Sequence, residues 1–319
     1  MLCLSGLLCA LMALLYWLRP DSCAAVTFWP PWVWLAPGLL AAGLGASRGT
    51  KRLVAAIGLL WLGYLLVFAE EPASLICRRP WPSPDFETAR RHGRALRVIS
   101  LNCAAGSKEA ADEVAQYRPD IVLLQESPSR REIERLARQL FGDTSGVVCG
   151  VDTSIISHGV AIPHAVSGLL DPFFTEARVR LVSGIEVEVA SVHLLPPTVG
   201  TDIWSPKHWR QHAENRRARR RQVRQIIRHV ESLHRRVPLI IGGDFNAPAG
   251  DAVFCLLRPY LHDTFDEGGV GWGNTVINDM PVSRIDQVWA SDDLRAAGVV
   301  ARKTRHSDHR MVISDLRLR

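Results

Sequence analysis

The segment PLIIGGDFNAPAGD, residues 238–251, decides the fold. Its leading apolar residues predict a strand buried in a sheet. The two glycines that follow allow the backbone to turn closely where the strand ends. Asp244 and Asn246 come next, two residues apart, so in strand geometry both side chains project to the same side. An acceptor and a donor placed in this way suit a water molecule that attacks beside a phosphate oxygen. The same residues also describe a strand that ends in an ordinary Asp-Asn turn.

Length and composition leave room for one large domain and an accessory region in the 319 residues. A net charge of +6 and a pI near 9.1 suit an anionic partner without naming one. The seven cysteines include no CxxC pair, which argues against a structural zinc site. Their scattered positions do not predict a disulfide framework, although one bridge in the C-terminal part stays open.

Residues 1–69 predict a membrane region with three transmembrane helices, at about residues 2–18, 26–45 and 53–69. Each apolar run is about as long as a bilayer-crossing helix requires. Aromatic residues near the ends of the first two runs are typical of a membrane interface. The alternatives are a cleaved signal peptide for the first run and a buried hairpin for the other two. No basic residue precedes the first run, which argues against a signal peptide.

Loop charges predict the orientation. The connector between the second and third runs carries Arg48, Lys51 and Arg52, and the positive-inside rule places it in the cytoplasm. The N-terminus is then also cytoplasmic. The sequence therefore predicts a multi-pass protein of the cell membrane, with everything after Ala69 on the extracytoplasmic side.

The rest of the chain predicts a tether followed by a soluble domain. Residues 70–94 hold four prolines among charges and predict an extended linker. A domain of residues 95–319 follows. Its predicted strands lie at 97–101, 120–124, 153–156, 160–166, 178–182, 185–193, 284–290 and 311–316, and its predicted helices at 110–117, 128–140 and 207–236.

The long helix predicted over 207–236 carries many arginines. An apolar stripe that includes Val223, Ile226 and Val230 predicts that the arginines face away from the core. Three uses remain open for such a face: solvation, contact with anionic lipid head groups, or contact with nucleic acid phosphates. The absence of interleaved aromatic residues disfavours a single-strand nucleic acid binder.

Six polar signals share one placement, at or near the end of an apolar strand. Any one of them alone is ordinary: a glutamate after a strand is usually a surface residue, and a histidine between apolar residues is often a satisfied core residue. Their joint occurrence indicates a single site. They are Asn102, Glu126, His193, the Asp244/Asn246 pair, Asp286 and the Asp308-His309 pair.

On these motifs the chain resembles the endonuclease/exonuclease/phosphatase superfamily, which includes DNase I-like nucleases, inositol polyphosphate 5-phosphatases and neutral sphingomyelinases. The resemblance covers about residues 95–319. It implies an α/β fold with a two-sheet β-sandwich flanked by helices in four layers. The matching segments are SLN (100–102), LLQE (123–126), SVHL (191–194), GGDFNAP (242–248), SRIDQVW (283–289) and SDHR (307–310).

The resemblance also implies a role for each residue. Glu126 is the expected principal Mg²⁺ ligand, with Asn102 and Asp308 near the same ion. Asp244 and Asn246 are expected to orient the water and the scissile phosphate. His309 is expected to contact the phosphate, with its imidazole ring held by Asp286. His193 is expected to lie on the opposite side of the phosphorus.

Elementary chemistry agrees with these roles. Mg²⁺, or Mn²⁺ as the alternative ion, takes oxygen ligands, and the absence of a Cys/His cluster argues against zinc. A histidine paired with a carboxylate has a raised pKa and can face a phosphate as a cation near neutral pH.

The sequence departs from the family pattern in three places. Asn102 is followed by Cys103-Ala104-Ala105, where many relatives have a second polar residue. Ser157-His158-Gly159 stands where relatives often carry Ser-Arg. The sequence identifies no acidic partner for His193.

The predicted function is that of a membrane-anchored, Mg²⁺-dependent phosphoesterase. The anchor favours a lipid-linked phosphate or pyrophosphate, or a phospholipid head group. The layout is similar to that of membrane-bound bacterial superfamily members associated with glycopeptide resistance, and this resemblance implies a polyprenyl pyrophosphate. No obligate protein partner is expected. The alternatives are a membrane-tethered nuclease, whose DNA binding would be salt-sensitive, and a catalytically silent membrane binding protein on the same fold.

Overall fold

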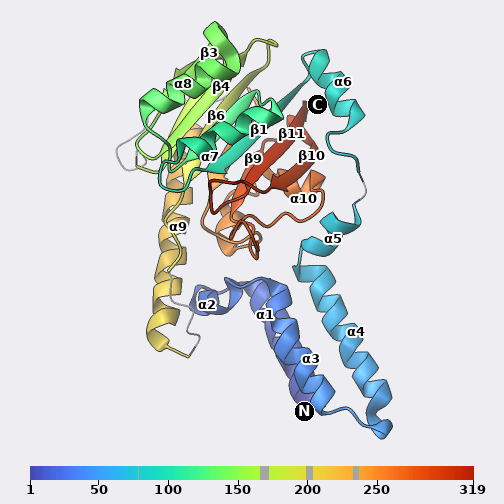
Figure 1. Cartoon of the computed structure of the whole chain (residues 1–319). Coiled ribbons are helices and arrows are strands. Elements are labelled where there is room, and N and C mark those ends of the chain that lie inside the picture. The colour runs from blue at the N-terminus through green and yellow to red at the C-terminus, as the bar shows by residue number, and fades with distance from the viewer. Residues whose placement is uncertain (78, 166–171, 199–203, 233–236) are drawn as a thin grey trace.

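An α/β domain stands on a bundle of N-terminal helices in the computed structural model of the protein (Figure 1). The structure describes residues 1–77, 79–165, 172–198, 204–232 and 237–319. The N-terminal helices are α1 (Leu2–Leu18), α2 (Ala24–Thr27), α3 (Leu35–Leu44) and α4 (Lys51–Phe68), with short 3₁₀ turns at Asp21–Cys23, Pro31–Trp34 and Arg48–Thr50.

The helices α1, α3 and α4 pack together around Trp61, whose side chain is buried. The Trp61 Nε1–H donates to Ser5 Oγ at 3.1 Å, and the Ser5 hydroxyl donates to the Gly38 carbonyl oxygen at 2.7 Å. The outer surface of the bundle is apolar, because large side chains on all three helices are exposed. Among them are Leu7, Leu11, Leu14, Leu40, Leu44, Leu59, Leu62 and Leu66.

The three predicted spanning helices are not shown: the described residues hold one candidate, or two if a bent helix pair counts as one span. By length and composition, one helix in the described residues could cross a membrane by itself, Arg48–Phe68, and α1 is apolar but shorter. The second predicted span, residues 26–45, is not one helix. It bends by 75° between Asp21–Thr27 and Pro31–Leu44. Pro30 and Pro31 explain the break, since proline lacks an N–H and disfavours helical geometry in the residue before it.

The predicted extended linker is wrong, because residues 70–94 contain two helices, α5 (Glu71–Ile76) and α6 (Pro84–Arg91). The Ser83 hydroxyl caps α6 by accepting from the Phe86 N–H at 3.1 Å. Phe86 and Ala89, three residues apart, are buried against Ala95. Segment 84–91 therefore packs on the domain rather than tethering it.

In the described residues, the domain has eleven strands that form one curled sheet. The order along the sheet is β10-β11-β1-β2-β4-β5-β6-β7-β9-β8, with β3 paired to β4. The strands are β1 (Ala95–Asn102), β2 (Ile121–Gln125), β3 (Ser145–Cys149), β4 (Thr153–Pro163), β5 (Phe174–Leu181), β6 (Glu186–His193), β7 (Leu239–Asp244), β8 (His262–Asp263), β9 (Asp286–Ala290), β10 (Leu294–Arg302) and β11 (Met311–Leu318). The sequence analysis predicts most of these but misses β3, β8 and β10, and it divides β4 into two strands, the second of which extends to residue 166, outside the described residues.

The curl occurs within β4. Ser157 pairs with β2, whereas Gly159 pairs with β5. Gly159 has a φ of +149°, and a Cβ there would lie 2.1 Å from the Arg180 carbonyl oxygen, so only glycine fits. The two halves of the sheet then face each other across a core that includes Val98 and Val187. The two sheets of the predicted sandwich are therefore continuous through β4 and form one curled sheet.

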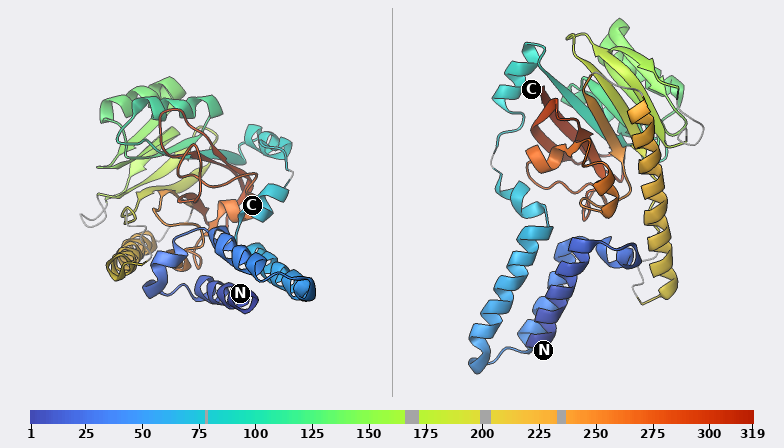
Figure 2. Two further views of the ribbon diagram at one scale, coloured as in Figure 1. Left: turned by 60° about the horizontal axis from the view of Figure 1, so that its bottom comes forward. Right: turned by 180° about the vertical axis from the view of Figure 1, so that it is seen from behind.

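Helices cover both outer faces of the sheet. The helices α7 (Lys108–Asp112) and α8 (Arg130–Phe141) pack on the β1–β2 half, and α9 (Pro206–Ser232) packs on the β6–β7 half. Further short helices are α10 (Thr264–Gly268) and 3₁₀ turns at Glu113–Tyr117, Gly142–Thr144 and Ala252–Leu256. The helix α9 extends past the sheet to the N-terminal helices (Figure 1 and Figure 2); the end of its predicted range, 233–236, lies outside the described residues.

The prediction that the α9 arginines face away from the core holds for Arg221, Arg224 and Arg228, which are exposed. It is wrong for Arg216 and Arg219, which are 1% and 2% exposed. Arg216 lies seven residues before Val223 and continues the face of the apolar stripe, where Thr27 of the N-terminal region contacts it. Arg219 lies four residues before Val223 on the same face and donates to the Leu195 carbonyl oxygen.

Candidate active site

Sheet register brings three of the predicted site residues into one row. His193 lies opposite Asp244 in the parallel β6–β7 pair, and Asp244 lies opposite Asp286 in the antiparallel β7–β9 pair. The row needs Gly243, whose φ is +153° and whose Cβ would lie 1.9 Å from the Val192 carbonyl oxygen. A buried strand end therefore presents two carboxylates and a histidine side by side.

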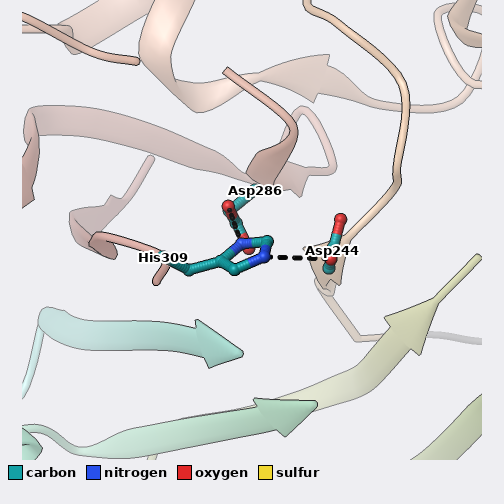
Figure 3. A group of neighbouring side chains, drawn as sticks. All are labelled: Asp244, Asp286 and His309. Carbon is teal, nitrogen blue, oxygen red and sulfur yellow. Dashed lines mark hydrogen bonds and ion pairs between the residues drawn. The ribbon is translucent and has the colours of Figure 1, made fainter. Parts of the chain in front are cut away.

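His309 joins this row from the loop before β11 (Figure 3). Its Nδ1 lies 2.9 Å from Asp286 Oδ2, and its Nε2 lies 3.9 Å from Asp244 Oδ2. Burial alone lowers the pKa of His309, but the carboxylates of Asp286, Asp244 and Asp308 outweigh it and raise the pKa to about 10. His309 is therefore a buried cation at neutral pH, held by Asp286 as expected.

Asp244 and Asn246 are joined by a turn rather than by strand alternation. β7 ends at Asp244, and Asn246 has a φ of +50°, a left-handed conformation. The Asn246 N–H donates to Asp244 Oδ1 at 2.8 Å, and its Nδ2 donates to the Leu194 carbonyl oxygen at 2.8 Å. The expected strand geometry is wrong, but the turn still places Asn246 beside Asp244 and the end of β6.

A second group of predicted residues gathers on the other half of the sheet. Asn102 ends β1 and Glu126 follows β2. The Asn102 Nδ2 donates to Glu126 Oε1 at 3.1 Å and to Asp244 Oδ2 at 3.2 Å, so it links this group to the row. The Ser307 hydroxyl donates to the Asn102 carbonyl oxygen at 2.7 Å, which brings the exposed Asp308 to the same edge. All eight predicted site residues thus lie around one end of the curled sheet.

The carboxylates of this second group, Glu126 and Asp308, are the kind of ligand that a hard divalent ion takes, whereas Asn102 turns Nδ2 to Glu126 and its Oδ1 accepts from the Ala104 N–H. Glu126 has a φ of +45°, an uncommon conformation for this residue, and its carboxylate is aimed by Asn102 and by the Ala105 N–H at 2.5 Å. Asp244, Asp286 and His309 also place ligand atoms within 4.8 Å of one another. That triad suits Mg²⁺ less well, because it includes an imidazole and because His309 Nδ1 already bonds to Asp286.

Asp152 is the functional neighbour that sequence analysis misses. It precedes β4, and its Oδ2 lies 2.5 Å from His193 Nδ1. Burial lowers the pKa of His193, but the hydrogen bond to Asp152 and the charge of Asp244 outweigh it, so the pKa is raised. Asp152 directly precedes the apolar strand that begins at Thr153. A polar residue beside an apolar strand is therefore visible in the sequence here too, but it stands before the strand, whereas the predicted site residues follow theirs.

The segment Ser157-His158-Gly159 does not contribute to the site. Ser157 pairs with Ile121, at the end of β2 that is remote from Glu126. The His158 ring stacks on Phe141, with ring centroids 4.9 Å apart. This departure from the family pattern therefore marks a structural position, the turn of β4 between the two halves of the sheet.

The model of the endonuclease/exonuclease/phosphatase family matches residues 99–309, which is most of the domain. The chain belongs to this family. Its members are hydrolases of phosphate ester bonds and generally depend on a divalent metal ion, so the protein is a hydrolase acting on ester bonds. No curated protein matches the sequence.

Solved structures of the endonuclease/exonuclease/phosphatase fold resemble the domain at low identity. A family protein from Bacteroides thetaiotaomicron aligns with a TM-score of 0.55 and 14% identity over 70% of this chain and 98% of its own. A mannosyl-6-phosphatase from the same organism aligns with a TM-score of 0.53 and 15% identity over 69% and 99%. A humanized D. rerio TDP2 aligns with a TM-score of 0.51 and 16% identity over 70% of this chain and 98% of its own. These likenesses establish the fold.

Proposed function

We propose that the protein is a membrane-anchored, Mg²⁺-dependent phosphoesterase of the cell membrane, whose extracytoplasmic domain hydrolyses a lipid-linked phosphate or pyrophosphate. The observation that carries the proposal is the direct packing of the domain on the helix bundle. Glu70 and Glu71, just after α4, reach into the domain: Glu70 pairs with Arg284 at 2.5 Å, and Glu71 accepts from Asn274 Nδ2 at 3.0 Å. Arg284 lies two residues before Asp286. The proposed anchor and the candidate site are thus close in structure.

The apolar outer surface of the bundle supports the membrane placement. The 18 residues of α4 are about 27 Å long at 1.5 Å per residue, close to the roughly 30 Å of a bilayer core. A domain fixed at one end of such a bundle meets head groups more readily than it meets a duplex. This geometry favours a lipid-linked phosphate, and Mn²⁺ remains the alternative ion.

Each site residue has a proposed role that follows from its position. Asp244, with Asn246 beside it, orients the attacking water. His309 presents a cation to the phosphate, and Asp286 fixes the orientation of its ring. His193, held by Asp152, lies on the other side of Asp244 and protonates the leaving group. Such pre-positioned charges act on the charge that develops in the transition state and are worth several kcal/mol.

Asn102, Glu126 and Asp308 would hold the ion. When bound, Mg²⁺ supplies positive charge to the phosphate oxygens. The chain's own contribution is the aimed carboxylate of Glu126 and the Asn102 amide, which connects it to Asp244.

The test uses the full-length protein in detergent with Mg²⁺, assayed against a polyprenyl pyrophosphate and against plasmid DNA. His309→Ala serves as the inactive control, with kcat expected to fall about 10²-fold or more. Phosphate release from the lipid alone, lost in the variant, supports the proposal. Nicking of DNA alone would instead make the protein a tethered nuclease. Activity on neither substrate nor on any simple phosphoester would favour a silent binding protein.

A further inference from the structure

A cavity of about 210 Å³ lies between the helix bundle and the catalytic domain. We call it the junction cavity. Tyr16, Trp29 and Phe68 line it from the bundle side, and Gly250 and Ser283 from the domain side. None of the proposed catalytic residues or metal ligands lines it. It is therefore a space separate from the candidate active site, at the end of the bundle where a membrane interface would lie.

Two arginines give the junction cavity its charge. Arg19 follows α1, and its Nε–H donates to the Tyr16 carbonyl oxygen at 2.7 Å. The terminal nitrogens of Arg19 lie beside Gly250, and Arg258 lines the same space from the domain. Within the described part of the chain, neither guanidinium forms an ion pair with a carboxylate. Burial is the main cause that lowers the pKa of Arg19, Asp251 opposes it, and the charge of Arg258 lowers it further.

The acidic residues around the junction cavity are already engaged. Glu70 and Asp266 lie 2.5 Å and 3.6 Å from Arg284. Glu71 accepts from Trp32 Nε1 at 3.1 Å and from Asn274. These carboxylates form their ion pairs and hydrogen bonds with groups other than Arg19 and Arg258, although burial raises the pKa of Asp266 and the charge of Arg258 partly opposes that rise. Two guanidinium groups that share a half-buried space, neither of them in an ion pair with a described carboxylate, favour an anionic ligand.

Ser283 supplies an independent sign of a ligand. Its side chain is 8% exposed and lines the junction cavity, and its Oγ has no hydrogen-bond partner among the described residues. A buried hydroxyl without a partner costs free energy that a bound acceptor would recover. A phosphate oxygen is such an acceptor, and it would also satisfy the two arginines.

We propose that the junction cavity binds the phosphate head group of a membrane lipid between Arg19 and Arg258, separately from catalysis. The volume is below the roughly 300–1,000 Å³ of sites that enclose drug-sized ligands, so it suits a head group whose acyl chains stay along the bundle. The inference rests on the proposed membrane placement and not on the catalytic assignment. Its consequence is that one lipid would fix the domain against the bundle.

The test measures thermal unfolding of the full-length protein in neutral detergent with EDTA. All proteins carry His309→Ala, so that no lipid is consumed and binding is read independently of activity. The probes are dioleoyl phosphatidic acid, dioleoylglycerol and inorganic phosphate. We expect phosphatidic acid to raise Tm and dioleoylglycerol to leave it unchanged. We expect Arg258→Gln and Arg19→Gln to weaken the apparent affinity for phosphatidic acid at least tenfold.

Arg224→Gln is the matched control, because Arg224 is an exposed arginine on α9 that does not line the cavity. Arg258→Gln is the decisive variant, since its side chain is exposed and its loss should leave the unliganded Tm unchanged. Equal binding by Arg258→Gln and Arg224→Gln would overturn the proposal, as would an equal shift with dioleoylglycerol. A matching shift with inorganic phosphate alone would overturn the lipid assignment.

Discussion

At the scale of single residues, Asp244 is the point where both halves of the site meet. Asn102 donates to it from the β1–β2 half, and both histidines lie within 4 Å of it, with Nε2 of His193 at 3.8 Å and Nε2 of His309 at 3.9 Å. Burial and the neighbouring Asp286 raise the pKa of Asp244, and the two histidines oppose that rise. The charge states of these groups therefore depend on one another, so a change at one alters the others.

Asp152→Asn tests the proposed role of His193. The carboxylate of Asp152 raises the pKa of His193, and the amide would remove that charge, so the pKa should fall. If protonated His193 donates to the leaving group, activity is lost as pH rises through this pKa. The alkaline limb of the kcat profile should then move to lower pH. The measurement is kcat against pH for both proteins on one soluble phosphoester.

A lower kcat with an unchanged alkaline limb would show that Asp152 acts on His193 only by orientation. Asp143→Asn is a suitable control, because Asp143 lies in the exposed turn Gly142–Thr144 and forms no hydrogen bond or ion pair with a described site residue.

Glu126→Gln tests the metal assignment. The substitution keeps the shape of the side chain but removes one anionic ligand, so the Mg²⁺ concentration that gives half-maximal activity should rise at least about 10-fold. Removal of divalent ions with EDTA should abolish activity in the unmodified protein, and Mg²⁺ should restore it. Direct calorimetric titration of Mg²⁺ gives a readout other than activity. Unchanged Mg²⁺ binding in Glu126→Gln would contradict this assignment and would indicate that the ion binds at the Asp244, Asp286 and His309 triad.

At the scale of secondary structure elements, the sequence predicts the strands of the domain and the residues at their ends better than it predicts contacts between segments that are distant in the sequence. Polar residues at the ends of apolar strands identify eight residues that the fold brings to one edge, because strand burial and strand ends are encoded locally. Asp152 escapes prediction because it is 41 positions from His193 and meets it only through the β4–β6 arrangement. The break at Pro30 has a local signal, two consecutive prolines, which is overlooked when the segment is interpreted only as an apolar run. The helix α6 also has one, a Ser-Pro cap, which is overlooked when the segment is interpreted only as a proline-rich linker.

The helix α9 shows the same limit. Its stripe predicts one buried face, but the part of that face before Val223 is covered by the N-terminal region and carries a buried arginine, Arg216. Arg216 donates to Asp251 Oδ2 at 3.0 Å and to Thr27 Oγ1 at 2.7 Å, and the two charged side chains are 1% and 0% exposed. Arg217 and Arg220 approach Asp21 at 3.6 Å and 3.2 Å. The arginines therefore join α9 to the bundle as well as forming a solvated face.

Arg216→Met should destabilise the full-length protein strongly. It leaves the Asp251 carboxylate buried without its partner, which typically costs about 3–5 kcal/mol. The control is Arg224→Met on the same helix, which removes an exposed arginine and should change the free energy of unfolding by less than about 0.5 kcal/mol. Denaturant unfolding in detergent measures both. Equal effects of the two substitutions would contradict the buried-pair assignment.

At the scale of the whole molecule, the helix bundle has a basic connector at one end, acidic residues at the other and an apolar outer surface between them. The N-terminus and the basic connector lie together at the end of the bundle opposite the catalytic domain (Figure 1). Leu2 and Gly45 are in close proximity there, since a Cβ on Gly45 would lie 2.8 Å from Leu2 Cγ. The acidic residues that follow α4, Glu70 and Glu71, lie at the domain end. The predicted orientation would place the end that carries Arg48, Lys51 and Arg52 in the cytoplasm and the domain end outside it.

Reporter fusions at the C-terminus test this orientation. We expect alkaline phosphatase fused after Arg319 to be active, because it matures outside the cytoplasm, and a cytoplasm-dependent fluorescent protein at the same position to be dark. The positive-inside rule gives the physical reason, and it also provides the control. Replacing Arg48, Lys51 and Arg52 with glutamine removes the charge that retains the connector, so part of the population should invert and gain fluorescence. Fluorescence of the unmodified fusion without phosphatase activity would place the catalytic domain in the cytoplasm, and the substrate would then have to be sought on the inner face of the membrane.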